Sequence, residues 1–345
     1  MNNPFSLDFG AKPNLFIARN PELQKIRHVF EAETPSSHMF MIIGARGTGK
    51  TVLMTAVSKD IREMKNWIHI DLNPDTDMLQ SLAANLYKKA KKDFPKIKLG
   101  VSVKGVSVNI ESEEKYSDIQ LDIDTIFESL KKHNIRVLIT IDEVVNSKNM
   151  REFSSYFQHC LREEYPVFVI MTGLYKNIRA LQNNRSHTFL RRTPKIVLTP
   201  LNMERIAKKY EEIFGLESKK AMEMAAFTGG YSYGFQILGF LVFESETKQL
   251  DDVLFEYKMN LIENSYEKIW EELSVNERKV LRAIAECDDN ATVKEVRGKT
   301  DFDTNNFSTY QNTLEKSGIL ALDSSYGRIR FVLPLFREYV LSENL

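Results

Sequence analysis

The stretch GARGTGKT at residues 44–51 has the residue types and spacing of a phosphate-binding loop. It matches the P-loop pattern G-x-x-x-x-G-K-[ST] at every fixed position and lies between an apolar segment and a helical pattern. Glycines let the backbone curl so that successive N–H groups point at one phosphate, and the following helix start adds its positive dipole end. Lys50 would reach the β- and γ-phosphates of a nucleotide, and the Thr51 hydroxyl would bind Mg²⁺. The residues expected to hold the nucleotide are Gly44, Ala45, Arg46, Gly47, Thr48, Gly49, Lys50 and Thr51.

Two acids at the end of an apolar segment are the second chemical feature. Residues 137–143 read VLITIDE, which is typical of a Walker B strand. Asp142 would hold Mg²⁺ through water, and Glu143 would polarise a water for attack on the γ-phosphate. Solvated acids capping a strand would give the same letters, but the complete P-loop favours the catalytic interpretation. Because no Asn/Thr-Lys-x-Asp motif for guanine is present, ATP is the expected nucleotide.

Thr172 comes at the end of another apolar segment, residues 167–171. A polar side chain just past a buried strand could sense the γ-phosphate or orient the attacking water. A strand-end hydroxyl or a helix cap explains the same residue equally well, so both interpretations stay open.

Such residues need a sheet whose strand ends meet at one edge, and the apolar pattern predicts one. Five short apolar segments, each bounded by polar or turn residues, are typical of strands buried on both faces of a parallel sheet. Helical patterns of about 10–15 residues between them indicate right-handed βαβ units. The strands are expected at 39–43, 67–71, 137–141, 167–171 and 196–198, and the helices at 51–65, 78–92, 119–133 and 150–163.

The remaining segments predict smaller parts of the fold. Residues 96–111 alternate in polarity and contain two glycines, which favours a β-hairpin outside the main sheet. Helices alone are expected after Pro200, at 203–214, 218–227, 231–247 and 251–272. Three further helices at 273–286, 292–299 and 303–316 and a hairpin at 319–322 and 328–333 follow in the order of a winged helix. The predicted domains are an α/β core over 1–200, a helical lid over 201–272 and a winged helix over 273–345.

Together these features resemble an AAA+ ATPase of the initiator-like branch, the archaeal and eukaryotic origin-recognition type, or its STAND-type relatives. The resemblance rests on the P-loop, on the pair Asp142–Glu143 and on the order of core, lid and winged helix, and it covers nearly the whole chain. It implies an α/β P-loop NTPase fold with a five-stranded parallel sheet. It also implies ATP and Mg²⁺ as ligands, ATP hydrolysis and a nucleotide-dependent homo-oligomer.

The resemblance adds site residues at the N-terminal side of the P-loop. The segment FIARNPEL, residues 16–23, is similar to the stretch that lines the adenine in this family, so Ile17, Ala18 and Arg19 are expected to touch the base. Thr172 falls at the family's sensor-1 position.

The resemblance also identifies residues that would act between subunits or through the lid. Arg191 and Arg192 lie just before the fifth strand, where these families carry an arginine finger. Surface ion pairs are the alternative for this pair. Residues 228–235 read TGGYSYGF and lack the arginine that initiator-type proteins usually carry at the start of a lid helix. This segment is nearer the Gly-x-Pro region of STAND ATPases, although the proline is absent.

Two segments could contact DNA. The third helix of the predicted winged helix would enter the major groove, and the wing would add two arginines. The side chains concerned are Asn305, Asn306, Ser308, Thr309, Gln311 and Asn312 on the helix and Arg328 and Arg330 on the wing. Residues 274–345, however, hold ten Lys/Arg and eleven Asp/Glu, a net charge of about −1, whereas a phosphate-contacting domain is normally basic. A winged helix that docks a protein partner without DNA contact is therefore the alternative.

The most lysine-rich segment of the chain lies in the predicted α/β core instead. Residues 88–105 carry seven lysines and one aspartate, so a lysine-rich helix and hairpin with Lys98 and Lys104 could follow a DNA backbone. A solvated helix face is the alternative.

Composition excludes other classes of protein. The 345 residues include 47 basic and 47 acidic side chains, and the apolar fraction of 43% is that of a globular chain rather than a disordered or collagenous one. The two cysteines cannot form a disulfide framework, which favours a reducing, cytoplasmic setting. The longest apolar run, residues 235–243, is too short to span a bilayer, and the first residues have no signal-peptide pattern, so no membrane partner is expected.

Overall fold

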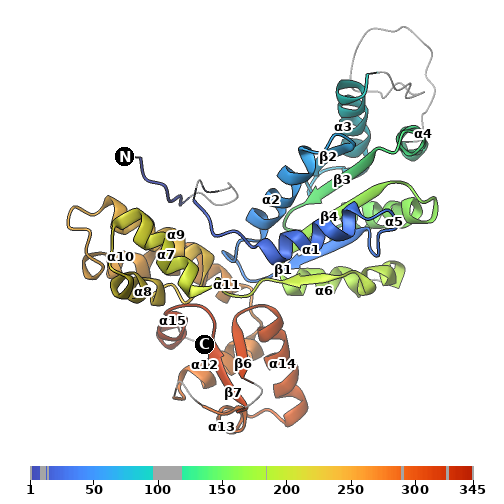
Figure 1. Cartoon of the computed structure of the whole chain (residues 1–345). Coiled ribbons are helices and arrows are strands. Elements are labelled where there is room, and N and C mark those ends of the chain that lie inside the picture. The colour runs from blue at the N-terminus through green and yellow to red at the C-terminus, as the bar shows by residue number, and fades with distance from the viewer. Residues whose placement is uncertain are drawn as a thin grey trace. The chain divides into compact units, whose positions relative to one another are not determined.

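The computed structural model describes residues 2–7, 13, 15–95, 119–183, 185–288, 291–323 and 326–343, without the side chains of 185–188 (Figure 1). The hairpin predicted at 96–111, with Lys98 and Lys104, lies outside these residues. The chain packs into two compact units. The first comprises Met1–Ala18, Gly44–Val52 and Val197–Leu345, and the second comprises Arg19–Ile43 and Leu53–Ile196. The division into three domains stays a prediction.

The predicted five-stranded parallel sheet is confirmed, with strand order β2-β3-β4-β1-β5. Its strands are β1 (Met39–Ile43), β2 (Trp67–Leu72), β3 (Arg136–Ile141), β4 (Val167–Gly173) and β5 (Lys195–Val197). Ile43 of β1 pairs with Gly173 of β4, and Ile141 of β3 pairs with Met171 of β4. The carboxyl ends of these three strands therefore meet at one edge of the sheet. The P-loop continues directly from β1, and Asp142 directly follows β3.

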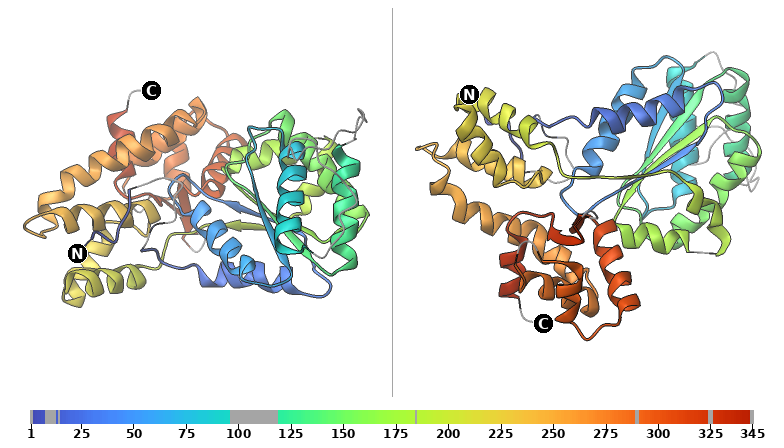
Figure 2. Two further views of the ribbon diagram at one scale, coloured as in Figure 1. Left: turned by 90° about the horizontal axis from the view of Figure 1, so that it is seen from above. Right: turned by 60° about the horizontal axis from the view of Figure 1, so that its bottom comes forward.

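Helices cover both faces of this sheet, which is why β1 and β4 are buried along their whole length (Figure 2). The helices are α1 (Asn20–Glu31), α2 (Lys50–Arg62), α3 (Met78–Asp93), α4 (Ile119–Lys132), α5 (Lys148–Arg162) and α6 (Tyr175–Gln182). On one face, the apolar side chains of α3, α4 and α5 form one core with alternate residues of β1–β4. On the other face, the ring of Phe30 in α1 packs 5.5 Å from Phe40 of β1 and 4.9 Å from Phe168 of β4.

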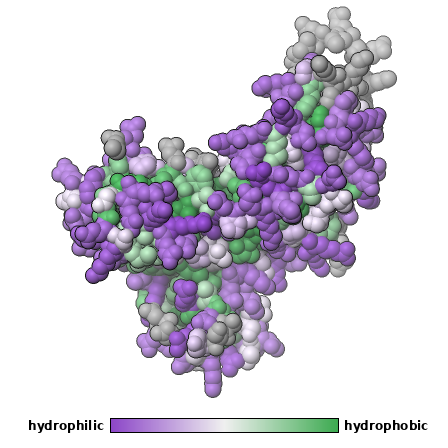
Figure 3. Space-filling model, in the orientation of Figure 1, coloured by the Kyte–Doolittle hydropathy of each residue, from purple (hydrophilic) through white to green (hydrophobic). Residues whose placement is uncertain are grey.

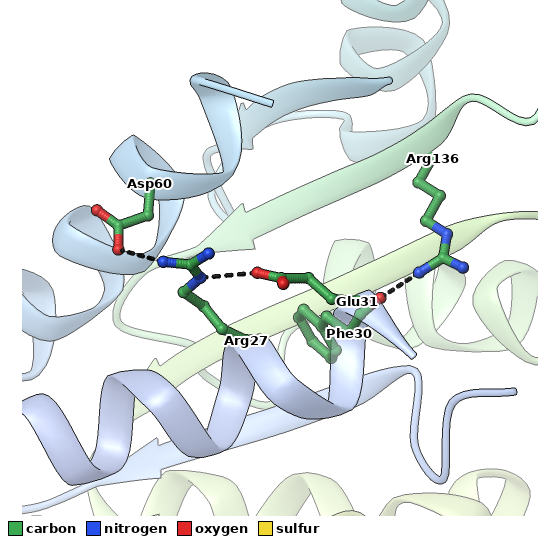
Figure 4. A network of polar contacts seen from close by, with 5 residues as sticks. All are labelled: Arg27, Phe30, Glu31, Asp60 and Arg136. Carbon is green, nitrogen blue, oxygen red and sulfur yellow. Dashed lines mark hydrogen bonds and ion pairs between the residues drawn. The ribbon is translucent and has the colours of Figure 1, made fainter. Parts of the chain in front are cut away.

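The helix α1 was not predicted from the sequence, and polar contacts fix it in place (Figure 4). Arg27 of α1 contacts Glu31 at 2.7 Å and Asp60 of α2 at 3.4 Å. Arg136 of β3 donates to the carbonyl of Phe30 and, at 2.9 Å, to that of Ala32. These contacts tie the end of α1 to the sheet and to α2. Two further elements were also missed, α6 and the 3₁₀ helix η1 (Arg185–Arg192).

The first unit contains the helices that follow the sheet. They are α7 (Met203–Phe214), α8 (Ser218–Ala226), α9 (Ser232–Glu244), η2 (Asp251–Val253), α10 (Leu254–Leu261), η3 (Ile262–Tyr266) and α11 (Glu267–Glu271). The single helix predicted at 251–272 is thus interrupted, because η3 is a π-helical turn. Such turns insert one residue into the helical ladder and are frequent at functional sites.

The last part of the first unit has the predicted order of three helices and a hairpin. It consists of α12 (Val275–Ala285), α13 (Val293–Gly298), α14 (Thr304–Lys316), β6 (Leu320–Asp323), β7 (Arg328–Phe331) and α15 (Phe336–Ser342). A capping box of Ser274 and Glu277 begins α12, and β6 pairs with β7 antiparallel. The helix α15 was not predicted. Its Phe336 and Tyr339 pack against Tyr266 of η3, so this part shares a core with the helices before it.

The surface drawn in Figure 3 is mainly hydrophilic. Among the helices of the described residues, none has the length and apolar character needed to cross a bilayer.

Candidate nucleotide site

The loop between β1 and α2 has the backbone conformation that its glycines allow. Gly47 and Gly49 have φ values of +70° and +89°, a region that residues with a side chain rarely adopt. Lys50 is nearly buried, and its Nζ donates to the carbonyls of Gly44 at 3.1 Å and Ala45 at 2.9 Å. The loop therefore closes into a ring spanned by its own lysine. Thr51 follows as the second residue of α2.

The side chain of Arg46 leaves the loop instead of facing its centre. Its Nε and Nη2 both contact Oε1 of Glu272, at 2.9 and 2.7 Å. Glu272 directly follows α11. Of the eight residues predicted to hold a nucleotide, Arg46 would thus contribute its backbone, and its charge is paired within the first unit.

Asp142, Glu143 and Thr172 come together at the carboxyl edge of the sheet in the second unit. The Thr172 hydroxyl, fully buried, donates to Oδ1 of Asp142. The backbone N–H of Glu143 contacts both Oδ1 of Asp142 and Oγ1 of Thr172, each at 3.1 Å. The N–H of Val144 donates to the Thr172 carbonyl at 2.9 Å. Thr172 is therefore the residue that fixes the turn carrying both acids.

This turn holds Glu143 in an unfavourable backbone conformation. Its φ is +51°, in the left-handed region, which costs a residue with a long side chain of order 1–3 kcal/mol. Its side chain is exposed, and its N–H is held by the two contacts above. Strain of this kind persists only where surrounding contacts impose it, and it concentrates at functional sites.

The residues predicted to touch adenine lie in different surroundings. Ile17 is buried in the core of the first unit, and the carbonyl of Ala18 accepts from Arg205 of α7 at 3.3 Å. Arg19, at the start of α1 in the second unit, has a side chain only 9% exposed, and Glu22 lies 3.9 Å away. Burial lowers the pKa of Arg19, and the nearby Glu22 carboxylate partly offsets this.

Arg191 and Arg192 both lie exposed at the end of η1. The Nε of Arg191 donates to the Gln182 carbonyl at 3.1 Å, and the Gln182 side chain donates to the Leu190 carbonyl at 2.6 Å. The Gln182 side chain therefore holds the backbone of η1, and the Gln182 carbonyl accepts a hydrogen bond from the Arg191 guanidinium. Within the part of the chain that the structure describes, the Arg192 side chain makes no hydrogen bond or ion pair, so it is the better placed of the two to reach another molecule.

The residues predicted to contact DNA are mostly exposed. Asn305 and Asn306 lie on the first turn of α14, although the Asn306 side chain donates to Asp303 at 2.7 Å. Arg328 and Arg330 point outward from β7, and Arg328 lies over the Tyr326 ring at 5.1 Å. One interpretation was wrong: Gln311 is only 7% exposed and donates to Glu315, so it does not face a partner.

A polar chain beside the Walker B strand was not predicted. Thr140 of β3 donates to Asp71 of β2 at 2.6 Å, and Nε2 of His69 lies 2.9 Å from the same hydroxyl. Because the hydroxyl hydrogen points to the carboxylate, His69 must donate through Nε2. The alternation of His69 and Asp71 along β2 is the sequence signal that could have revealed it.

Comparison with known proteins gives a family match for the larger part of the chain. Residues 16–234 match a family described as an ATPase domain predominantly from Archaea, and residues 263–340 match a domain of unknown function. A search of curated proteins gave no match.

Two solved structures share the fold over nearly the whole chain. The Walker-type ATPase PABY2304 of Pyrococcus abyssi is 15% identical, with a TM-score of 0.65, and the match covers 97% of this chain and 99% of that one. The ORC2 protein of Aeropyrum pernix, in ADPNP–ADP complexes, is also 15% identical, with a TM-score of 0.62, and the match covers 97% and 96% of the two chains. The family match spans more than half of the residues and includes the P-loop and the two acids. This chain therefore belongs to the family of ATPase domains found predominantly in Archaea.

Proposed function

We propose that this protein binds ATP with Mg²⁺, hydrolyses it, and uses its nucleotide state to control the helices and the C-terminal winged helix of the first unit. The observation that carries the proposal is the loop 44–51. It combines a complete phosphate-binding motif with left-handed backbone at Gly47 and Gly49. Successive N–H groups in such a loop form a concave anion site at the start of a helix.

The roles of the individual residues follow from their chemistry. Lys50 would exchange its contacts with the loop carbonyls for the β- and γ-phosphates. The Thr51 hydroxyl and the Asp142 carboxylate are oxygen donors of the kind that Mg²⁺ prefers, so the donor set fits this ion. When bound, Mg²⁺ would neutralise charge on the phosphates. Glu143 would accept a proton from the attacking water, and Thr172 would hold the turn of the two acids.

Substitutions can separate the proposed role of Lys50 in nucleotide binding from that of Glu143 in hydrolysis. Lys50→Ala should abolish nucleotide binding, because it removes the cation that meets the phosphates. Glu143→Gln should keep ATP affinity within a few-fold but lower turnover about 100-fold or more, because the amide cannot accept the proton. Equilibrium binding of ATP and release of phosphate measure the two effects.

Each of the two variants has a control at an exposed residue of the same type. Lys59→Ala removes an exposed lysine of α2, and Glu152→Gln neutralises an exposed acid of α5. Both should behave like wild type. Unimpaired hydrolysis by Glu143→Gln would refute the assignment of the base.

DNA is the proposed partner of the ATPase. The exposed Asn305, Arg328 and Arg330 support contact through the C-terminal part. The near-neutral charge of residues 274–345 supports the alternative, a slow STAND-like switch that recruits a protein through the same part without touching DNA. The dependence of DNA affinity on salt discriminates between the two.

We further propose that Arg192, rather than Arg191, completes the site of a neighbouring subunit in a nucleotide-dependent homo-oligomer. Its exposure and the engagement of Arg191 with Gln182 support this choice.

A further inference from the structure

Three consecutive carbonyls of the P-loop are held from outside by the start of α9. The Tyr231 hydroxyl donates to the Arg46 carbonyl at 2.8 Å. The Tyr233 N–H donates to the Gly47 carbonyl at 3.0 Å, and the Ser232 hydroxyl donates to the Thr48 carbonyl at 3.0 Å. All of these residues belong to the first compact unit.

These contacts with the carbonyls also set the direction of the N–H groups in the same peptide units. In a trans peptide, the C=O of one residue and the N–H of the next point in opposite directions within one plane. A carbonyl held outward therefore turns the following N–H inward. The three contacts consequently orient the N–H groups of Gly47, Thr48 and Gly49 toward the centre of the loop, where a phosphate would accept from them.

The glycine at position 47 reflects this arrangement. The P-loop motif leaves this position open, but a Cβ on Gly47 would lie 2.1 Å from the Tyr231 hydroxyl oxygen and 2.8 Å from Cβ of Tyr233. Its φ of +70° is a second reason for glycine. The sequence of the loop is thus adapted to the segment that packs against it.

The Tyr231 hydroxyl is itself fixed in place. It lies 2.7 Å from Oγ of Ser265, which is fully buried in the π-helical turn η3. Because Tyr231 donates to Arg46, Ser265 must donate to Tyr231. Burial raises the pKa of Tyr231, so the hydroxyl keeps the proton that it donates.

We propose that Tyr231 and Ser232 are positioning residues for phosphate binding, which act by holding the P-loop carbonyls so that the loop N–H groups converge on one anion. This inference rests on the proposed nucleotide binding. It assigns a role to the segment 231–233, which has no charged side chain of its own.

The test compares Mg–ADP with adenosine, which has the same base and sugar but no phosphate. Tyr231→Phe should weaken Mg–ADP binding about five- to tenfold, and Ser232→Ala about three- to fivefold, because each loses one hydrogen bond to the loop. Adenosine affinity, measured by competition, should stay within about twofold of wild type. Ser232→Thr, which keeps the hydroxyl, should retain the wild-type ratio of the two affinities.

Tyr210→Phe is the matched control. This tyrosine is also fully buried and donates to a carbonyl, that of Phe235 at 2.9 Å, but it belongs to the helical core and does not hold the P-loop. It should lower thermal stability without changing the ratio of ADP to adenosine affinity. If Tyr231→Phe and Ser232→Ala also leave that ratio unchanged, the inference is wrong. A wild-type protein that binds no Mg–ADP would overturn the proposed function, and the inference with it.

Discussion

Thr172 shows how one hydroxyl can organise the turn that carries the two candidate catalytic acids. It donates to Asp142 and accepts from the N–H of Glu143, while its carbonyl accepts from Val144. The hydroxyl is thus a satisfied strand-end group that contacts the Asp142 carboxylate and the Glu143 backbone, and its role as a sensor of the γ-phosphate stays a prediction. Its buried position means that it reaches them from within the sheet.

Removing this hydroxyl should affect turnover more than binding. Thr172→Val removes one donor to Asp142 and one of the two contacts that hold the Glu143 N–H, and the φ of +51° at Glu143 depends on such contacts. We expect kcat for ATP hydrolysis to fall about tenfold or more, with Mg–ADP affinity changed less than about threefold, and Thr172→Ser to recover most of the activity.

Thr140→Val is the control for loss of a buried strand hydroxyl, because Thr140 contacts Asp71 and His69 instead of the two acids. Both valine variants should lose about 1 kcal/mol of stability. Equal effects of the two on kcat would contradict a special role for Thr172.

Among the elements, the strands and the P-loop helix could be predicted from sequence because their signals are local. An apolar run of five residues before GARGTGKT leaves few alternatives to a buried strand and a helix start. The helices α1, α6 and α15 were missed, although Leu23, Ile26 and Phe30 of α1 follow helical spacing, so part of this signal was present in the sequence. The interruption at η3 was not foreseen either; within it, Ser265 contacts Tyr231, 34 residues earlier, and no local pattern encodes such a pairing.

The contact of Tyr231 with the P-loop was equally hidden. It joins residues 185 positions apart, and no local pattern encodes such a pairing. The only sequence signal is Gly47, a glycine at a position where the motif does not require one. Its meaning becomes clear only when the partner segment is known.

Packing between β2, β3 and α3 gives the second unit a specific pH dependence. Burial lowers the pKa of His69 to about 3, and the positive charges of Arg62 and Lys89 act in the same direction. Above pH 6.5 the histidine is neutral in both the folded and unfolded chains. Below that value His69 binds a proton in the unfolded chain but stays neutral in the folded chain. The free energy of unfolding therefore falls as the pH falls toward 3.

We therefore expect His69 to account for about 1–3 kcal/mol of lost unfolding free energy between about pH 6.5 and 4, a range that allows for its partial exposure. Denaturant unfolding of the wild type and of His69→Gln across this range gives two profiles of unfolding free energy against pH. Because the two proteins share every other titrating group, the difference between the profiles is due to His69. The wild-type curve should fall more steeply. Parallel profiles would show that the imidazole titrates normally in the folded protein.

For the whole molecule, the formal net charge of zero is a sum of unlike parts. The C-terminal part offers the exposed Arg328 and Arg330 within a nearly neutral surrounding. On α3, Lys88, Lys91 and Lys92 are exposed on consecutive turns. A net charge of zero is therefore compatible with two separate surfaces, on α3 and on the C-terminal part, that could contact a DNA backbone. The two surfaces predict different salt dependences of DNA binding.

Each lysine or arginine that neutralises a phosphate contributes about 0.9 to the slope of log affinity against log salt concentration. If the C-terminal part holds DNA, the double variant Arg328→Ala/Arg330→Ala should reduce that slope by about 1.8, measured by anisotropy of a labelled duplex from about 50 to about 200 mM salt. If α3 holds it, the triple alanine variant at 88, 91 and 92 should reduce the slope by about 2.7 instead. Lys219→Ala/Lys220→Ala, two exposed lysines of α8, is the control with the same loss of net charge as the arginine pair. Absence of binding at about 50 mM salt, with and without Mg–ATP, would argue against DNA and favour the protein-docking switch, because the electrostatic attraction on which both surfaces depend is strongest there.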